Sequence, residues 1–145
     1  MPRDFSEAYL YNFEDLKAGQ TASIARTVSE ADILAFAGVS GDTNPVHVDQ
    51  EFAESTMFKG RIAHGALSIS YISTVIGTKL PGPGAIYLSQ SVKFKAPVRI
   101  GDTVVARVTI TALEADKRRM TLSTVCTVGE TEVTVGEAQV LLPKR

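Results

Sequence analysis

The residues best suited to acid–base chemistry in this sequence are gathered in one short segment, residues 36–49. It contains Asp42 and His47, which lie five positions apart, and His47 is one of only two histidines in the chain. An imidazole titrates near neutrality, and burial can shift a carboxyl group towards it, so such a pair can move protons to and from one water molecule. Pro45 restricts the backbone between them and favours an extended Asn44. We therefore predict a rigid, non-helical loop that carries an acid–base pair.

Spacing alone leaves structural roles open for the same residues. Asp42 and Asn44 could be turn residues whose side chains bind nearby backbone, and His47 could be a hydrogen-bonded structural histidine. For Asp49, a role as the cap of the short segment that follows it is favoured over a role as a third acid. A metal site is not expected, because two histidines and one cysteine make no ligand cluster. The chain also lacks a Gly-rich phosphate loop, a Gly-x-Ser-x-Gly elbow and a Cys-x-x-Cys pair.

Two helices and one early strand are expected in the first half of the chain. Ser29, followed by acidic residues, indicates the start of a helix that Gly38 and Gly41 bring to an end. A second helix is expected over residues 65–76, which are apolar apart from small hydroxyls, so this helix should be buried. An early strand is expected over residues 21–28.

The second half alternates between apolar and polar residues, as β-strands do. Strands are expected over residues 86–94, 104–110, 120–128 and 133–142. In the first of these, Gln90 shares the phase of Ile86, Leu88, Val92 and Phe94. In the last strand the apolar phase changes around Gly136, which predicts a bulge or bend. The pattern predicts an α+β fold in which a curved antiparallel sheet wraps around a central apolar helix. No repeat or linker interrupts it, so we expect one domain over residues 1–145.

Bulk properties exclude several classes of protein. The net charge of −1, without a basic block, argues against a nucleic-acid partner. No apolar run approaches the roughly 20 residues that span a bilayer, and the acidic N-terminus does not resemble a signal peptide. The lone Cys126 falls in a strand-like run, where a buried inert thiol is expected, and suits a reducing compartment. We expect a cytoplasmic protein that does not associate with membranes.

The segment from Ser40 to His47, Ser-Gly-Asp-Thr-Asn-Pro-Val-His, resembles the signature of the MaoC-like, (R)-specific enoyl-CoA hydratases. The similarity continues through Gly-Arg-Ile-Ala-His-Gly at 60–65, Tyr-Leu-Ser-Gln-Ser-Val-Lys-Phe at 87–94 and Pro-Val-Arg-Ile-Gly-Asp at 97–102. It also includes Phe-Glu-Asp-Leu at 13–16 with Gly-Gln at 19–20. The resemblance covers nearly the whole chain, in order, without a large insertion.

This resemblance implies a hot-dog fold and a homodimer with its active sites at or near the interface. It implies hydration of a trans-2-enoyl-CoA to a (R)-3-hydroxyacyl-CoA, with dehydration as the reverse. Water would lie between Asp42 and His47, and the backbone N–H of Gly65 would bind the thioester oxygen at the start of the central helix. Neither a metal nor a redox cofactor is implied, because coenzyme A arrives as part of the substrate.

Other site residues carry open alternatives. Asn44 either shapes the loop, orders the water or forms a plain Asx-turn. For His64, a role in positioning the loop or in contacting the substrate is favoured over a role as a second catalytic imidazole. Gln90 has a polar group in an apolar layer, so it either serves the site or forms a structural hydrogen bond across the dimer. The coenzyme A phosphates could be bound by any of four cations, namely Lys59, Arg61, Lys93 and Lys95.

Three other functions compete with hydration of acyl-CoA. An acyl-CoA thioesterase is the first, since hot-dog proteins also catalyse that reaction, but such enzymes usually carry an acidic residue on the central helix and residues 65–78 have none. A non-catalytic acyl-CoA-binding protein is the second. The third is the same hydration on acyl-carrier-protein thioesters or on branched substrates. The preferred length of the acyl chain stays open. The pathway stays open as well, with polyester precursor supply, fatty-acid breakdown and assimilation of short acids as the alternatives.

Overall fold

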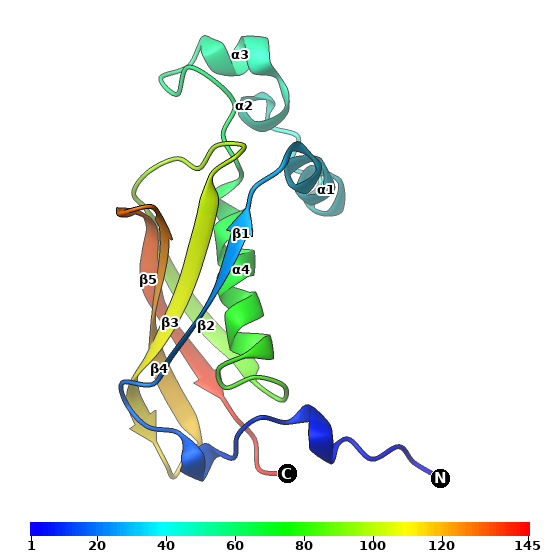
Figure 1. Cartoon of the computed structure of the whole chain (residues 1–145), viewed down its shortest axis with the longest axis vertical. Helices are drawn as coiled ribbons and strands as arrows, with labels where there is room; N and C mark the ends of the chain where they lie inside the picture. Colours follow the sequence, from blue (N-terminus) through cyan, green and yellow to red (C-terminus); the bar gives the residue numbers. More distant parts are fainter.

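A computed structural model describes residues 1–145 and shows a curved sheet wrapped along one long helix (Figure 1). Its elements, in chain order, are the 3₁₀ turns η1 (Ser6–Ala8) and η2 (Phe13–Asp15), β1 (Thr21–Thr27), α1 (Glu30–Ser40), α2 (Pro45–Val48), α3 (Gln50–Glu54), α4 (Gly65–Thr78), β2 (Ile86–Phe94), β3 (Thr103–Glu114), β4 (Arg119–Val128) and β5 (Thr131–Leu141). The short helices α1 to α3 lie at one end of the sheet, and both chain termini lie at the other.

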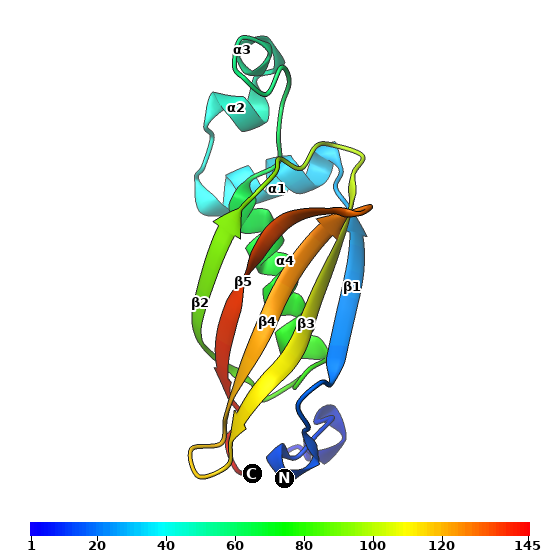
Figure 2. The same ribbon diagram turned by 90° about the vertical axis from the view of Figure 1, so that its left-hand side faces the viewer.

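The sheet has five strands in the order β1-β3-β4-β5-β2, and all neighbouring pairs are antiparallel. Helix α4 lies along one face, behind the strands in Figure 2. The two strands that come first in the chain, β1 and β2, form the two edges of the sheet. The three strands that follow them, β3, β4 and β5, form its centre. The predicted α+β architecture, an antiparallel sheet around a central apolar helix, is confirmed.

The core lies between α4 and the sheet because the central strands β3 and β4 bury every second residue along most of their length. Helix α4 contributes its buried apolar face from Leu67 to Ile76, and β3 buries Val104, Ala106, Val108 and Ile110. Full burial of an aliphatic side chain of this size stabilises a fold by about 1.5–3 kcal/mol. Cys126 of β4 is part of this core, and burial raises the pKa of its thiol to about 11, so the predicted inert thiol is confirmed.

Helix α1 begins and ends where the sequence predicts. The Ser29 hydroxyl accepts from the Asp32 N–H (3.1 Å), and the Asp32 carboxylate accepts from the Ser29 N–H (2.9 Å). The latter bond holds the pKa of Asp32 below its usual value. Gly41 ends the helix with φ 78°, a conformation that glycine adopts without strain. Gly38, in contrast, lies inside the helix and does not end it.

Two strand details differ from the sequence prediction. The pairing of β2 with β5 skips Leu88, and this bulge turns Ile86 and Leu88 away from the face that Gln90 and Phe94 share. The prediction that all four have one phase was therefore wrong, because an inserted residue reverses every side chain before it.

The irregularity in β5 is real but lies at Val133, which the pairing with β4 skips, rather than at Gly136. Gly136 has a different constraint. A Cβ there would lie 1.8 Å from the Ser91 carbonyl oxygen, so the close approach of β2 requires glycine.

No helix is both long enough and apolar enough to cross a membrane.

Candidate active site

The segment between α1 and α3 contains a single helical turn, α2, and this corrects the prediction of a non-helical loop. Asn44 is outside the helical region (φ −49°, ψ 125°) but is not in the extended conformation that was expected, and its side-chain oxygen accepts from the Val46 N–H at 3.1 Å. Pro45 then occupies the first helical position, where its fixed φ suits a helix and its missing N–H costs nothing. Asn44 is thus the cap of α2. Asp49 caps α3 in the same way, accepting from the Phe52 N–H at 3.1 Å.

Asp42 lies directly after the glycine that ends α1 and is exposed. Its backbone N–H donates to the Ser40 hydroxyl (3.1 Å), and its Oδ1 accepts from the Asn44 N–H (3.2 Å). These bonds fix the carboxylate on the turn. The other carboxylate oxygen makes no hydrogen bond within the chain, so it is free to bind a water or a ligand.

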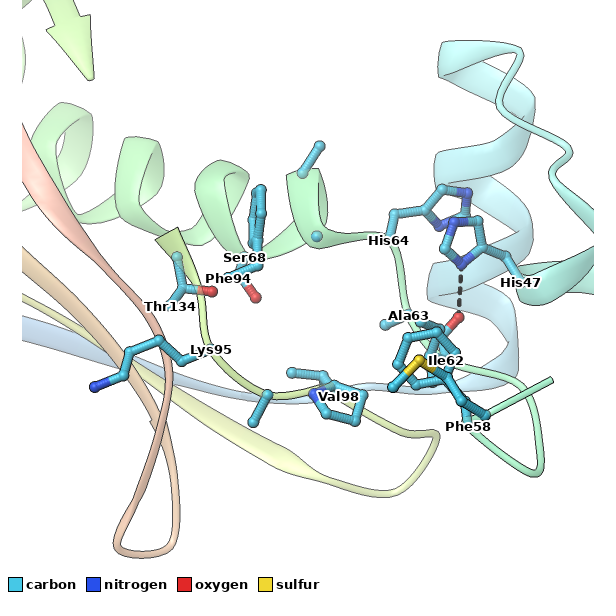
Figure 3. A pocket seen from close by; sticks show the side chains of 15 residues that line it. His47, Phe58, Ile62, Ala63, His64, Ser68, Phe94, Lys95, Val98 and Thr134 are labelled. Carbon is cyan, nitrogen blue, oxygen red and sulfur yellow. Dashed lines mark hydrogen bonds between the residues drawn. The ribbon is translucent and has the colours of Figure 1, made fainter. Parts of the chain in front are cut away.

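His47 is buried, and one hydrogen bond defines its tautomer. Its Nδ1 lies 2.8 Å from the carbonyl oxygen of Ile62, drawn as the dashed line in Figure 3. A carbonyl only accepts, so Nδ1 carries the hydrogen and a neutral His47 presents a lone pair at Nε2. That lone pair is the acceptor that a base requires.

His64 follows the same logic with the nitrogens exchanged. Its Nε2 lies 2.9 Å from the backbone carbonyl oxygen of Asp42, so Nε2 donates and Nδ1 has the lone pair. Nδ1 is buried and has no hydrogen-bond partner. His64 therefore ties the loop at Asp42 to the start of α4, which agrees with the predicted positioning role.

The structure brings Asp42, His47 and His64 together. One carboxylate oxygen and one nitrogen of each imidazole lie within 4.8 Å of one another. The two rings stack at 3.8 Å with 26° between their planes, and Phe36 packs on His64 at 4.8 Å. These groups are close enough to bind a metal. The same spacing allows one water to donate its two hydrogens to two of the acceptors.

Gly65 begins α4, and its backbone N–H is unpaired. The helix has no side-chain cap at its start, and the Gly65 N–H makes no hydrogen bond within the chain. Unpaired N–H groups and the positive end of the helix dipole coincide at this position, which favours a developing negative charge. Glycine also leaves room for a neighbour, since a Cβ here would lie 2.8 Å from Cε1 of Phe94.

A pocket of about 520 Å³ extends from the two histidines along the start of α4. It is lined by His47, Met57, Phe58, Ile62, Ala63, His64, Gly65, Ala66, Ser68, Phe94, Lys95, Ala96, Pro97, Val98 and Thr134. In Figure 3 the histidines lie at one end and the hydroxyls of Ser68 and Thr134 at the other. A mostly apolar wall with a few polar groups suits a small organic substrate. Only a weak signal in the sequence pointed to Ser68, which is one of the small hydroxyls on an apolar helix.

Gln90 does not reach this pocket. Its side-chain oxygen accepts from the Tyr87 hydroxyl, and its Nε2 donates to the Thr124 hydroxyl at 2.8 Å. A second Nε2 bond goes to the Ser91 carbonyl, also at 2.8 Å. Gln90 thus satisfies its hydrogen bonds within its own chain. This is the structural alternative, formed inside the sheet rather than across a dimer.

Of the four cations considered for phosphate binding, Arg61 is already engaged. Its Nε donates to the His47 carbonyl oxygen (2.6 Å), and its Nη1 donates to the Glu30 carboxylate (2.7 Å). Lys95 lines the pocket and forms an exposed ion pair with Glu132 (3.3 Å), while Lys59 and Lys93 do not line the pocket. The contact of Arg61 with the candidate base was missed, because nothing in the local sequence indicates it.

Comparison with known proteins identifies the family. The family described as "MaoC like domain" matches residues 13–134. This chain belongs to the MaoC-like family. Among MaoC-like relatives, the (R)-specific enoyl-CoA hydratase of Rhodospirillum rubrum is 60% identical over 136 residues, with 94% of each chain covered. The 3-hydroxybutyryl-CoA dehydratase of Methylorubrum extorquens is 47% identical, with 92% of this chain and 85% of that protein covered.

A solved structure shares the fold of this chain. The (R)-hydratase from A. caviae involved in PHA biosynthesis has a TM-score of 0.86 and 45% identity, covering 90% of this chain and 99% of that one. Its similarity supports the hot-dog fold that the sequence predicted.

Proposed function

We propose that this MaoC-like protein catalyses the reversible, (R)-specific hydration of trans-2-enoyl-CoA to (R)-3-hydroxyacyl-CoA. The observation that carries the proposal is that Asp42 and His47 lie together and that His47 shares its pocket with Gly65, whose N–H is unpaired. Acceptors for a water and a donor for an oxyanion are both required to add water to a conjugated thioester. The names of the relatives support the same reaction class.

The proposed chemistry begins with a water that donates to Nε2 of His47 and to the free oxygen of Asp42. The Asp/His pair removes one proton as the water oxygen bonds to C3, and the C2–C3 π electrons move onto the thioester oxygen. The Gly65 N–H binds that oxygen while it is negatively charged. The enolate then collapses, C2 takes a proton from the pair, and both residues regain their starting protonation. Coenzyme A enters and leaves as part of the substrate, and we propose no other cofactor.

We also propose that the protein acts as a homodimer. The edge strand β2 exposes Ile86, Leu88 and Phe94 together with an unpaired row of backbone groups, and proteins usually cover such an edge. Sedimentation analysis tests this proposal, and a monomer at micromolar concentration contradicts it. A single buried, protonated thiol at Cys126 suits the cytoplasm, which we propose as the compartment.

Addition of crotonyl-CoA to the purified protein tests the reaction. We expect loss of the conjugated-enoyl absorbance and a product that is oxidised by an (R)-specific, not an (S)-specific, 3-hydroxyacyl-CoA dehydrogenase. Release of free thiol without hydration contradicts the proposal and indicates a thioesterase. No change in either signal, with bound acyl-CoA detected by calorimetry, indicates a non-catalytic binding protein.

A further inference from the structure

Arg61 connects the two halves of the proposed acid–base pair. It lies between α3 and α4, its side chain is only 13% exposed, and both of its hydrogen-bonded nitrogens reach a different helix. Nε donates to the carbonyl oxygen of His47 at 2.6 Å, and Nη1 donates to the carboxylate of Glu30 at 2.7 Å. Glu30 is the first residue of α1, and the other end of α1 leads through Gly41 into Asp42. One guanidinium thus contacts the helical turn that carries His47 and the helix that precedes Asp42.

The neighbouring residue completes the attachment of His47. The Ile62 N–H donates to the Val46 carbonyl at 3.2 Å, and the Ile62 carbonyl accepts from Nδ1 of His47 at 2.8 Å. The backbone of α2 and the imidazole ring are therefore both attached to residues 61 and 62. A ring attached at Nδ1 alone could still move with its backbone. The bond from Arg61 to the His47 carbonyl restrains that backbone, so the direction of the Nε2 lone pair is set at two points.

Stability alone gives Arg61 little reason to be here. Its partner Glu30 is 51% exposed, and ion pairs with an exposed partner contribute only about 0–1 kcal/mol. Its Nη2 is buried without a hydrogen-bond partner, and an unpaired buried donor is unfavourable. An apolar side chain could fill the same space without this cost. What an apolar side chain could not do is donate to the His47 carbonyl, which has no helical partner at the end of α2.

We propose that Arg61 is a positioning residue, which holds the backbone of His47 so that Nε2 points at the reacting water. The proposal rests on the proposed hydratase function for its kinetic consequence. A displacement of a catalytic group by about 1 Å can lower a rate about 100-fold. The effect should fall on kcat rather than KM, because Arg61 does not line the pocket and its hydrogen bonds go to protein atoms.

Arg118 offers a matched control within the same chain. Its Nε donates to the Leu142 carbonyl oxygen at 3.0 Å and its Nη1 to the Glu14 carboxylate at 2.8 Å, and its side chain is 22% exposed. Arg118 directly precedes β4. Strand β4 begins at the end of the sheet opposite α1 to α3 (Figure 2). The two arginines therefore make the same pair of bonds, and only Arg61 makes them next to the proposed site.

The test compares Arg61→Met, Arg61→Lys and Arg118→Met in the crotonyl-CoA assay. We expect Arg61→Met to lower kcat by about 10- to 100-fold with KM changed less than about threefold. Arg61→Lys should recover only part of kcat, since a single ammonium cannot reach both acceptors as a planar fork does. Arg118→Met should keep kcat within about twofold while shifting Tm comparably. Equal kcat for Arg61→Met and Arg118→Met overturns the proposal. If Arg61→Met does not fold, Arg61→Lys against Arg118→Lys decides it.

A second readout does not depend on turnover. The ¹⁵N resonances of the His47 ring should indicate hydrogen at Nδ1 in the unmodified protein and an altered tautomer balance or broadened signals in Arg61→Met, but not in Arg118→Met. If the unmodified protein fails to hydrate crotonyl-CoA, the proposed function fails and this measurement still decides the role of Arg61. Unchanged His47 resonances in Arg61→Met contradict the positioning role.

Discussion

Two buried polar clusters of this protein, one at the end of the sheet and one within it, are built on opposite plans. In the sheet, Tyr87, Gln90 and Thr124 form a closed network in which the glutamine oxygen accepts and its nitrogen donates. Burial raises the pKa of Tyr87 to about 12, so the phenol remains a neutral donor. Beside α4, in contrast, His47 and His64 each use one nitrogen for a backbone carbonyl and leave the other with a lone pair.

The comparison distinguishes polar groups that stabilise the fold from polar groups that are available for catalysis. A buried acceptor without a partner costs about 1–3 kcal/mol, so folding alone would not select one. In this cluster the buried Nδ1 of His64 is such an acceptor, and an unpaired buried group calls for an explanation such as a catalytic role or a bound water. Removal of the closed cluster in the sheet should lower the stability of the protein and leave its turnover nearly unchanged. The open cluster should affect turnover far more than stability.

The largest expected effect is on the open cluster. Asp42→Asn and His47→Gln should each lower kcat/KM by about 100- to 10,000-fold, because each replaces a proton-transfer group by an amide that cannot perform this role. Circular dichroism and Tm should remain close to those of the unmodified protein. Asp49→Asn, at a carboxylate that only caps α3, is the control and should keep most activity. A variant of Asp42 or His47 with more than a tenth of normal turnover contradicts the assignment.

A methyl group at the start of α4 should have the next largest effect. Gly65→Ala places a Cβ 2.8 Å from the Phe94 ring, which must then shift within the pocket. We expect kcat/KM to fall about 10- to 100-fold, as for other small displacements at a reacting centre. Steady-state kinetics of Gly65→Ala with and without Phe94→Leu separates the causes. Recovery in the double variant indicates crowding by the ring, while an unimproved double variant indicates loss of access to the N–H itself.

The closed cluster should show the reverse pattern. Gln90→Leu leaves the partly buried Tyr87 hydroxyl and the buried Thr124 hydroxyl without their partner, which should lower the free energy of unfolding by about 1–3 kcal/mol. Urea unfolding measures this loss, and kcat/KM should stay within about threefold. Replacing Thr124 by Val in addition should cost less than the sum of both single changes, because the two residues share one network. A large loss of kcat/KM in Gln90→Leu would instead connect Gln90 with catalysis.

The smallest effect concerns pH and the core thiol. Folding raises the pKa of Cys126 from 9.0 to about 11, so above pH 9 the unfolded chain loses its thiol proton while the folded chain retains it. The folded state then binds more protons, and stability falls as pH rises, by about 1 kcal/mol at pH 10 from this group. Cys126→Val should remove that part of the alkaline loss. Urea unfolding of both proteins at pH 7 and pH 10 measures it, and an identical loss in both contradicts it.

What could be predicted from the sequence was set by local chemistry. Ser29 and Gly41 mark the two ends of α1 in the sequence, and the uncharged run after Gly65 indicates the helix α4, whose apolar face is buried. The family-like segment placed Asp42 and His47 together. Leu88 could not be recognised as a bulge, because its apolar side chain fits either face and the bulge depends on the partner strand β5. The contacts of Arg61 could not be predicted for a similar reason, since its partner Glu30 lies far away in the sequence.

Because β2 pairs with β5, the pocket cannot be complete until late in the synthesis of the chain. Phe94 of β2 and Thr134 of β5 both line the pocket, and the two strands are neighbours although β3 and β4 come between them in the chain. A ribosome that has just made Asp42, His47 and Gly65 has therefore supplied every group for the proposed chemistry and only part of the wall around the substrate. The wall closes when nearly the whole chain has been synthesised, so the nascent protein acquires its reactive groups well before a compartment to use them in.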